Sequence, residues 1–252
     1  KRDKKNMIEY RFYKTEAQAI TAFKLGEIDK LIDLTSFGDL AQWKNTSIEK
    51  YTKYDTIVTV FFNLKDKLLG EKSVRQALGY ALPEVNEERA FSPISKTSWA
   101  YADKVRKYNT NNAQSDKILN TGNINLDGKE ITITTFPQYL HSAQRIVQKW
   151  QELGPVVKVK VENSLPGEFQ VLISGQSVPP DPDQYPFWHS TQLGTNITSY
   201  ANVKVDKILE DARKESDVVK RKKLYSDFQR FLVEDAPAIF YYYPNRYTII
   251  RN

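Results

Sequence analysis

Short stretches in which apolar and polar residues alternate recur along the whole chain, and longer stretches of helical periodicity separate them. Residues 131–134, for example, place isoleucine at every second position between threonines, which is typical of a strand. Residues 157–161 repeat the pattern with valines. The sequence predicts strands over residues 8–13, 28–34, 57–62, 131–134, 157–161, 169–173, 238–243 and 247–250.

Helical periodicity is clearest before Gly154. The apolar residues between Ala143 and Trp150 follow i, i+3, i+4, i+7 spacing and therefore share one face, and Gly154 ends the helix. An earlier helix begins after Thr15, a predicted N-cap, and ends at Gly26. Further helices are predicted over residues 74–81, 203–214 and 218–235, with a short one from residue 116. Strands that alternate with helices in this way indicate an α/β sandwich.

Residues 57–62 differ from the other strands because all of them except Thr59 are apolar. Such a run indicates a strand that is buried on both faces. Residues 8–34 before it read as a β-α-β opening. We expect the apolar strand to carry the chain out of this first unit into a second α/β unit that begins near residue 63.

Residues 179–190 interrupt this pattern because they contain four prolines within eight residues. Proline fixes φ and removes a backbone donor, so neither a helix nor a central strand is expected there. The segment should form a stiff loop. It displays two carboxylates, an indole, a phenol and an imidazole with little conformational freedom left to lose, which suits contact with a ligand.

The composition narrows the class of protein. Apolar residues make up 40% of the 252 residues and aromatic residues 12%, which is enough for a folded core. The chain has no cysteine, which excludes disulfides, thiolate catalysis and sulfur-ligated metals from it. Its 37 basic residues are scattered among 31 acidic ones, so we interpret the net charge of +6 as solvated faces and expect no nucleic-acid partner. No apolar run reaches the roughly 18 to 20 residues of a membrane span.

Asp181 and Asp183 are the most conspicuous charged pair in the proline-rich loop. Two residues apart in an extended backbone, they would face the same side and could serve as paired carboxylates or bind a cationic group. An Asp next to a proline also commonly caps the backbone of a turn. The spacing leaves both roles open.

The sequence contains no recognisable motif for binding a metal or a cofactor. His141 and His189 belong to different predicted elements, and no third donor lies at the spacing of a metal site. The motifs of serine hydrolases, phosphate-binding loops, dinucleotide-binding folds and zinc peptidases are also absent. We therefore predict no metal, no cofactor and no catalytic residue.

Two tryptophans lie in predicted loops rather than on a periodic apolar face. Trp99 follows a segment rich in serine, and Trp188 belongs to the proline-rich loop, whereas Trp150 lies on the apolar face of its helix. We predict that Trp99 and Trp188 contact ligand and that Trp150 lies in the core. A loop tryptophan can also cover a core, and this alternative stays open for both.

Several segments occur in an order that resembles a known family. They are Phe62-Asn63-Leu64, residues 74–81 (VRQALGYA), Ser92-Pro93-Ile94, residues 98–101 (SWAY), Asp181-Pro182-Asp183, Trp188-His189-Ser190, Asn196, Tyr200 and residues 234–243 (EDAPAIFYYY). Together they resemble the peptide/nickel-type (family 5) solute-binding proteins of ABC importers, which include the oligopeptide-binding proteins. The resemblance runs from about residue 8 to the end of the chain.

The resemblance implies a fold of the periplasmic-binding-protein type (type II, cluster C) with two lobes. Residues 1–62 would form the second part of lobe one, residues 63–235 the large C-terminal lobe, and residues 236–252 the return segment to lobe one. Residues 57–62 and 236–242 would be the two connections between the lobes.

The same resemblance implies a function without catalysis. The ligand, with peptide as the leading class, would be held in a cleft between hinged lobes and delivered to the permease subunits of an ABC transporter. The protein would work outside the cytoplasm, in the periplasm or on the outer face of the cell membrane, with a lipid anchor, if any, outside this segment. The residues expected to line this lobe's side of the cleft are Trp99, Asp181, Asp183, Trp188 and Asn196.

One position departs from the family pattern. In some peptide-binding relatives an Asp three residues before the Asp-Pro pair binds the free amine of the peptide, and that position is Val178 here. The departure argues against ordinary oligopeptides with a free amino terminus as the ligand, unless Asp181, Asp183 or the missing lobe supplies the charge for the amine.

The resemblance covers the later half of the family, and residues 1–5 are basic rather than an export segment. We therefore expect the chain to be an excised part of a longer protein. If part of lobe one is missing, the apolar surfaces of the strands 8–13 and 57–62 should be uncovered.

An enzyme is the second hypothesis. A glycosidase-like hydrolase, or a sugar-binding protein, could use Asp181 and Asp183 with tryptophan platforms for the sugar. A hydrolase would need a second carboxylate about 5 to 10 Å from the first across a cleft. The sequence spacing identifies no such partner.

Overall fold

The computed structural model describes residues 8–252 and separates into two compact units. Among the described residues, unit 1 is residues 8–52 with Asn245–Asn252, and unit 2 is Lys53–Pro244. The sequence-based boundaries near residues 62 and 235 differ from this division because the strands β3 (Thr56–Phe62) and β8 (Ala238–Tyr243) pair with each other inside the sheet of unit 2. The two connecting segments predicted from the sequence therefore belong to unit 2.

The described part of unit 1 is a three-stranded antiparallel sheet with an α-helix and a short 3-10 helix. Its strands β1 (Lys30–Leu34), β9 (Asn245–Arg251) and β2 (Thr46–Thr52) lie in the order β1-β9-β2, with the short helix η1 (Gly38–Gln42) before β2. Helix α1 (Glu16–Lys24) begins as predicted, because the Thr15 side chain accepts a hydrogen bond from the Gln18 N–H. Phe23 of this helix is fully buried in the small core of the unit.

The strand predicted over residues 8–13 is wrong. These residues form no ladder with any described strand, and Ile8, Tyr10 and Phe12 are 74%, 68% and 94% exposed. Alternation gives a strand only where an edge receives it, and within the described residues β1 pairs with β9 alone. The expectation of uncovered apolar surface holds for this segment.

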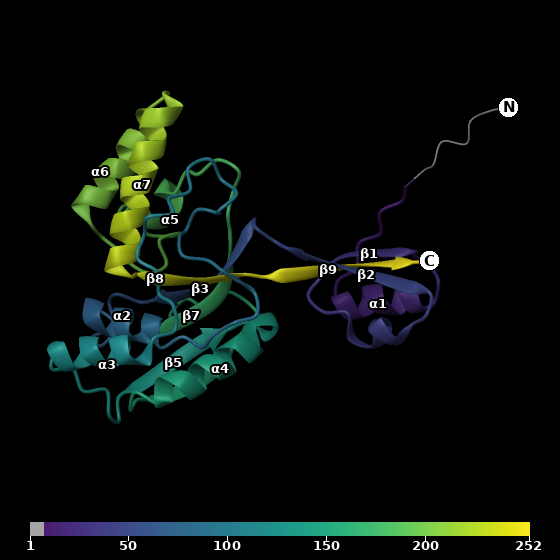
Figure 1. Cartoon of the computed structure of the whole chain (residues 1–252), viewed down its shortest axis with the longest axis horizontal. Coiled ribbons are helices and arrows are strands. Elements are labelled where there is room, and N and C mark those ends of the chain that lie inside the picture. Colours follow the sequence, from purple (N-terminus) through teal and green to yellow (C-terminus); the bar gives the residue numbers. More distant parts are fainter. Residues whose placement is uncertain (1–7) are drawn as a thin grey trace. The chain divides into compact units, whose positions relative to one another are not determined.

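Unit 2 is built on a mixed six-stranded sheet in the order β4-β8-β3-β7-β5-β6. Its strands β4 (Glu88–Arg89), β8, β3 and β7 (Val171–Ser177) pair antiparallel, whereas β5 (Glu130–Thr135) pairs parallel with β6 (Val156–Val161) and with β7. Helices α2 (Lys72–Tyr80), α3 (Asn112–Thr121) and α4 (Leu140–Gln151), with η2 (Pro137–Tyr139), cover one face of this sheet. Helices α5 (Tyr185–Trp188), α6 (Val203–Lys214) and α7 (Val218–Asp235) cover the other (Figure 1).

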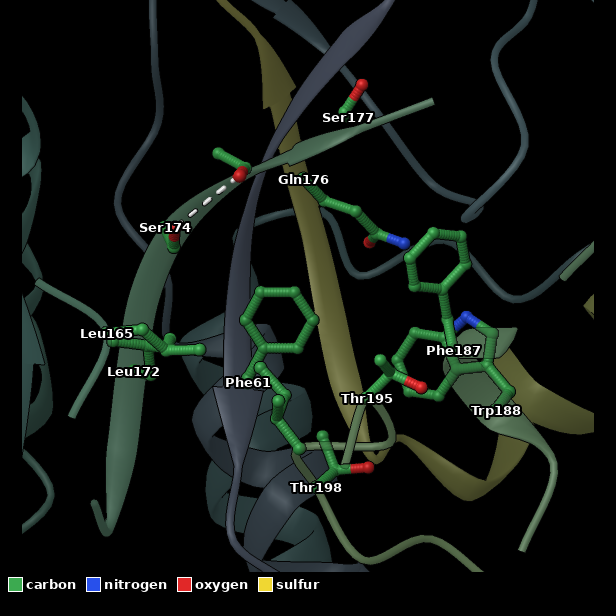
Figure 2. Close-up of a pocket in the computed structure, with 12 residues that line it drawn as sticks. Phe61, Leu165, Leu172, Ser174, Gln176, Ser177, Phe187, Trp188, Thr195 and Thr198 are labelled. Carbon is green, nitrogen blue, oxygen red and sulfur yellow. Dashed lines mark hydrogen bonds between the residues drawn. The ribbon is translucent and has the colours of Figure 1, made fainter. Parts of the chain in front are cut away.

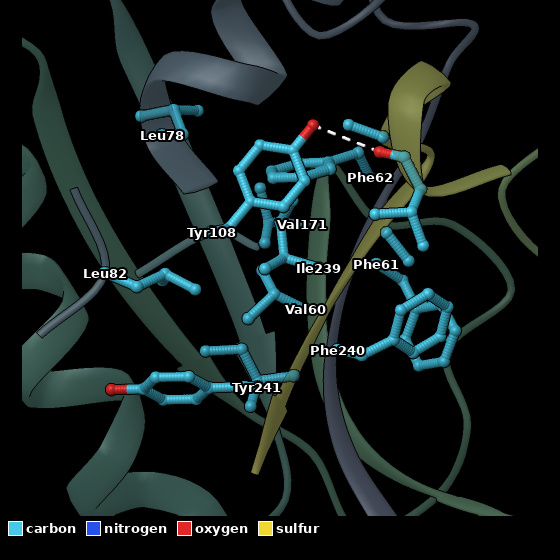
Figure 3. Close-up of a cluster of buried hydrophobic side chains, with 14 of the residues drawn as sticks. Val60, Phe61, Phe62, Leu78, Leu82, Tyr108, Val171, Ile239, Phe240 and Tyr241 are labelled. Carbon is cyan, nitrogen blue, oxygen red and sulfur yellow. Dashed lines mark hydrogen bonds between the residues drawn. The ribbon is translucent and has the colours of Figure 1, made fainter. Parts of the chain in front are cut away.

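Successive residues of β3 pack against the two layers of helices. Phe62 stacks on Trp150 of α4, and Phe61 stacks on Trp188 of α5. Figure 3 shows Val60 and Ile239 on the opposite side of the strands from the ring of Phe61. The strand is thus buried on both faces as predicted, and the expectation that its apolar surface lies uncovered is wrong.

The loop at residues 179–190 contains one helical turn that the sequence reading excluded. Helix α5 spans Tyr185–Trp188, with Pro186 in its first turn. Proline is tolerated there because the first N–H groups of a helix have no partner within it and the fixed φ suits the helix. The turn directs Phe187 and Trp188 toward the sheet (Figure 2).

Candidate ligand-binding site

A cavity of about 250 Å³ lies within unit 2, between the sheet, helix α5 and the loops that precede β7 and follow α5. Its apolar walls are Phe61, Leu165, Leu172, Phe187, Trp188 and Ile197 (Figure 2). Its polar lining is Ser174, Gln176, Ser177, Thr195 and Thr198. A largely apolar hollow with a few polar groups is typical of a small-molecule or side-chain site.

Strand β7 has an unpaired edge beside this cavity. On one side β7 pairs with β3 over its whole length, but on the other its ladder with β5 ends at Ile173. The Val178 N–H donates to Asp55 O on the β3 side, and neighbours in an antiparallel strand alternate in direction. Gly175 and Ser177 therefore direct their N–H and C=O groups to the open side, where no described strand meets them.

The side chain of Asn196 braces the loop that forms one wall. It is 5% exposed, its amide donates to Tyr200 O at 2.7 Å, and its oxygen accepts from Tyr200 N–H at 3.2 Å. The hydroxyl of Thr198, which lines the cavity, also donates to this oxygen at 3.1 Å. Asn196 itself lies behind the cavity wall.

Trp188 belongs to the core and to the cavity wall at once. It is 1% exposed, and its ring lies 6.4 Å from Phe61 and 6.1 Å from Phe240, measured between centroids. Its indole N–H donates to Gln184 Oε1 at 3.2 Å. Both interpretations of this tryptophan, core packing and ligand contact, are compatible with that position.

Asp181 and Asp183 each form an ion pair with a helix on this face of the sheet. Asp181 accepts two hydrogen bonds from Arg221 of α7, at 2.9 and 3.1 Å, and Asp183 lies 2.6 Å from Nη2 of Arg213 of α6. The hydrogen bond from Arg221 holds the pKa of Asp181 below its usual value. Asp181 also accepts from the Asp183 N–H at 2.9 Å, which is the turn-capping role that the sequence left open. Neither residue lines the cavity.

Trp99 is linked to the same ion pair. Its ring is 37% exposed, lies 6.2 Å from the ring of Tyr225 and has the guanidinium of Arg221 at 5.7 Å. Arg221 thus joins Trp99 to Asp181, at a place that the cavity does not include. The structure therefore brings Trp188 to the cavity and Asn196 behind its wall, while the other three predicted residues lie along α6 and α7.

Sequence reasoning missed Gln176 because it ended this strand at residue 173. The side chain is 9% exposed, and its Oε1 is buried without a hydrogen-bond partner in the part of the chain that the structure describes. Leu172, Ser174 and Gln176 fall at every second position of β7, so they share the face that carries the cavity. The sequence signal that could have revealed Gln176 is that the alternation of side chains along β7 continues through residues 174–177 (Ser-Gly-Gln-Ser).

Within residues 8–252, no group of three or more His, Cys, Asp or Glu side chains is arranged to hold a metal ion. His189 is 4% exposed and its Nδ1 lies 2.8 Å from the Thr191 hydroxyl, while His141 belongs to α4. Across the same residues, no helix is both long and apolar enough to cross a membrane.

The sequence matches a known family over most of its length. Residues 1–197 match the bacterial extracellular solute-binding proteins, family 5, middle region. The chain belongs to family 5. This membership confirms the resemblance drawn from the sequence motifs, and with it the expected type of fold.

Family 5 relatives agree with this fold. The oligopeptide-binding protein AppA of Bacillus subtilis is 28% identical over 226 residues, covering 75% of this chain and 42% of AppA. The structure of AppA in complex with a nonapeptide superposes with a TM-score of 0.78 at 24% identity, covering 94% of this chain and 54% of that one. NikZ of Campylobacter jejuni in complex with Ni(L-His) gives a TM-score of 0.81 at 24% identity, with the same coverage. The chain thus spans less than half the length of the curated relatives it matches.

Proposed function

We propose that this chain forms part of the ligand-binding region of a peptide-binding protein for ABC-type uptake. The observation that carries the proposal is the open edge of β7 at Gly175 and Ser177, which runs beside the cavity. An extended peptide can add to such an edge through main-chain hydrogen bonds while alternate side chains enter pockets. The solved structure of AppA, a relative, is a complex with a nonapeptide.

The proposal includes binding without turnover, release to permease subunits, and a location outside the cytoplasm. Family 5 membership supports these points, since its proteins are described as extracellular solute-binding proteins. The competing hydrolase hypothesis is weakened by the ion pairs of Asp181 and Asp183, because each carboxylate already accepts hydrogen bonds from an arginine. Paired carboxylates that work on a sugar need to reach the substrate.

A single-residue test addresses the β7 edge. Ser177→Pro removes an N–H that points to the open side and leaves intact the ladder bonds to β3, which the neighbouring residues make. Ser177→Ala keeps the N–H and removes only the hydroxyl. We expect Ser177→Pro to weaken peptide binding by about tenfold, the effect of losing one buried hydrogen bond, and Ser177→Ala to leave it nearly unchanged.

The measurement is isothermal titration calorimetry of the intact gene product with a pool of short peptides, followed by the individual peptides that bind. Thermal denaturation of both variants verifies that they fold. Equal peptide affinity for Ser177→Pro and Ser177→Ala would argue against binding by strand addition at β7. Release of heat with sugars and none with peptides would overturn the proposed ligand class.

A further inference from the structure

The buried amide of Gln176 carries an inference about which peptides bind, and it rests on the proposed function. Gln176 projects from β7 into the cavity, and in Figure 2 its amide lies close to the ring of Phe187. Gln176 is only 9% exposed, and its Oε1 has no hydrogen-bond partner among the described residues. Buried polar groups in folded proteins are almost always paired, so an unpaired acceptor in a cavity calls for a donor from outside the chain.

Three of the other polar side chains that line the cavity already form hydrogen bonds within the protein. The Thr198 hydroxyl donates to Asn196 Oδ1, the Thr195 hydroxyl donates to Pro186 O, and the Ser174 hydroxyl donates to Gly175 O at 3.4 Å. None of these bonds involves Gln176. Ser177 is exposed and can bond to water, whereas Gln176 Oε1 is buried and has no partner among the described residues. The amide oxygen is therefore the polar side-chain atom of this cavity that most needs a donor.

The size and walls of the cavity specify the rest of the guest. A dry cavity of about 150 Å³ lined by Leu, Ile and Phe holds a benzene molecule. The volume here is about 250 Å³, and Phe61, Phe187 and Trp188 supply aromatic walls. An aromatic ring fits this space and packs favourably against those rings.

An extended peptide on the β7 edge would deliver such a side chain. Alternate residues of an added strand direct their side chains to the same face as Leu172, Ser174 and Gln176. The cavity lies on that face and reaches Gly175 and Ser177, where the open backbone groups lie. One side chain of the peptide therefore enters the cavity while the backbone pairs with the edge.

We propose that this cavity selects an aromatic peptide side chain that carries a hydrogen-bond donor, tyrosine or tryptophan, and that Gln176 determines the selection. The ring fills the apolar space, and its O–H or N–H donates to Gln176 Oε1. Phenylalanine fills the same space but leaves the amide unpaired. Leucine lacks both the ring and the donor.

The test uses pentapeptides of alanine in which each position in turn holds Tyr, Phe, Trp or Leu. Calorimetry on the intact gene product should give about three- to tenfold tighter binding for Tyr than for Phe at one position, the effect of one hydrogen bond. Gln176→Leu should bring the Tyr-to-Phe ratio to about one while Phe affinity is retained. Gln151→Leu, the same change at an exposed position of α4, should preserve the wild-type ratio.

Thermal denaturation separates a binding role from a structural one. Because Gln176 Oε1 has no partner, Gln176→Leu should keep or raise the midpoint of unfolding. Peptide binding without a Tyr preference at any position, or a preference that survives in Gln176→Leu, would overturn this inference and leave the proposed function standing. Binding of no peptide at all would overturn both.

Discussion

Arg75 offers the sharpest test of how unit 2 is held together. This arginine of α2 is 4% exposed, and its guanidinium donates four hydrogen bonds to backbone carbonyls. Two acceptors, Asp235 O at 2.6 Å and Ala236 O at 2.9 Å, lie at the end of α7, where helix carbonyls lack partners. The other two, Leu69 O and Gly70 O, are both at 2.8 Å in the turn before α2.

The substitution Arg75→Met keeps an apolar stem and removes all four donors. Hydrogen bonds from a charged group contribute about 1.5–3 kcal/mol each, or about 6–12 kcal/mol for four. Burial of the charge takes several kcal/mol back, since desolvation of the guanidinium also lowers the pKa of Arg75. We therefore expect Arg75→Met to lower the free energy of unfolding by about 3–5 kcal/mol.

Urea denaturation followed by tryptophan fluorescence measures this loss, because Trp150 and Trp188 are both buried in unit 2. Arg230→Met is the matched control. Its side chain is 55% exposed on α7 and pairs with Asp227, so it should change the free energy of unfolding by less than about 1 kcal/mol. A loss below about 1 kcal/mol for Arg75→Met would refute the claim that this guanidinium joins α2 to the end of α7.

Three further changes test individual contacts. Asp181→Asn removes an exposed ion pair with Arg221 and should lower the free energy of unfolding by less than about 1 kcal/mol at neutral pH. Because the folded pKa of Asp181 lies below 3.8, the stability that this ion pair contributes is present above pH 3.8 and is lost on further acidification. Acid titration should therefore destabilise the wild-type protein more than Asp181→Asn. Equal acid sensitivity of the two proteins would contradict the ion pair of Asp181 with Arg221. Gly175→Ala would place Cβ 2.2 Å from the Tyr139 hydroxyl and should lower the free energy of unfolding by about 1–3 kcal/mol, as measured by urea denaturation. Tyr139→Phe should partly restore the stability of this variant. If the losses of the two single variants simply add in the double variant, the result would argue against the clash. Burial raises the pKa of Tyr243 to about 12, so its contribution to stability is complete below pH 10 and is lost as pH rises through 12. Tyr243→Phe should therefore reduce the loss of unfolding free energy between pH 10 and 12. An unchanged dependence of the unfolding free energy on pH in that range would refute the raised pKa of Tyr243.

Elements with strong periodicity and local caps could be predicted closely from the sequence. Helices α6 and α7 begin and end where the pattern placed them, because Asn202 and Asp217 cap their first turns with side-chain acceptors. Strand β8 also has its predicted bounds, since a run of apolar and aromatic residues is buried along its whole length. In these elements the local pattern and the tertiary packing agree.

Elements that depend on a distant partner could not be predicted. Strand β4 has two residues and exists because Glu88 and Arg89 pair with β8. Strand β2 was missed for a similar reason: none of its residues is fully buried, and its pairing with β9 defines it. Residues 8–13 show the opposite error, an alternating pattern without a described partner.

The candidate site was predictable in part for the same reasons. The proline-rich loop was identified as a wall of the site because its composition is conspicuous, and Trp188 does line the cavity. Nothing in the sequence tells which acidic residue meets an arginine thirty residues away, so the pairing of Asp183 with Arg213 was not foreseen. Ligand contact by Trp99, Asp181, Asp183 and Asn196 stays a prediction, to be tested by substitution in the same calorimetric assay.

The prolines that follow β7 also bear on aggregation. An open strand edge is a place where a second molecule can add a strand and where intermolecular sheets can grow. Here Pro179 and Pro180 come directly after Val178 and have no N–H to offer, so the edge ends within a few residues of Gly175. The edge is long enough for a short peptide and too short to pair with a whole strand of a neighbouring molecule, which lets a protein keep it exposed at high concentration.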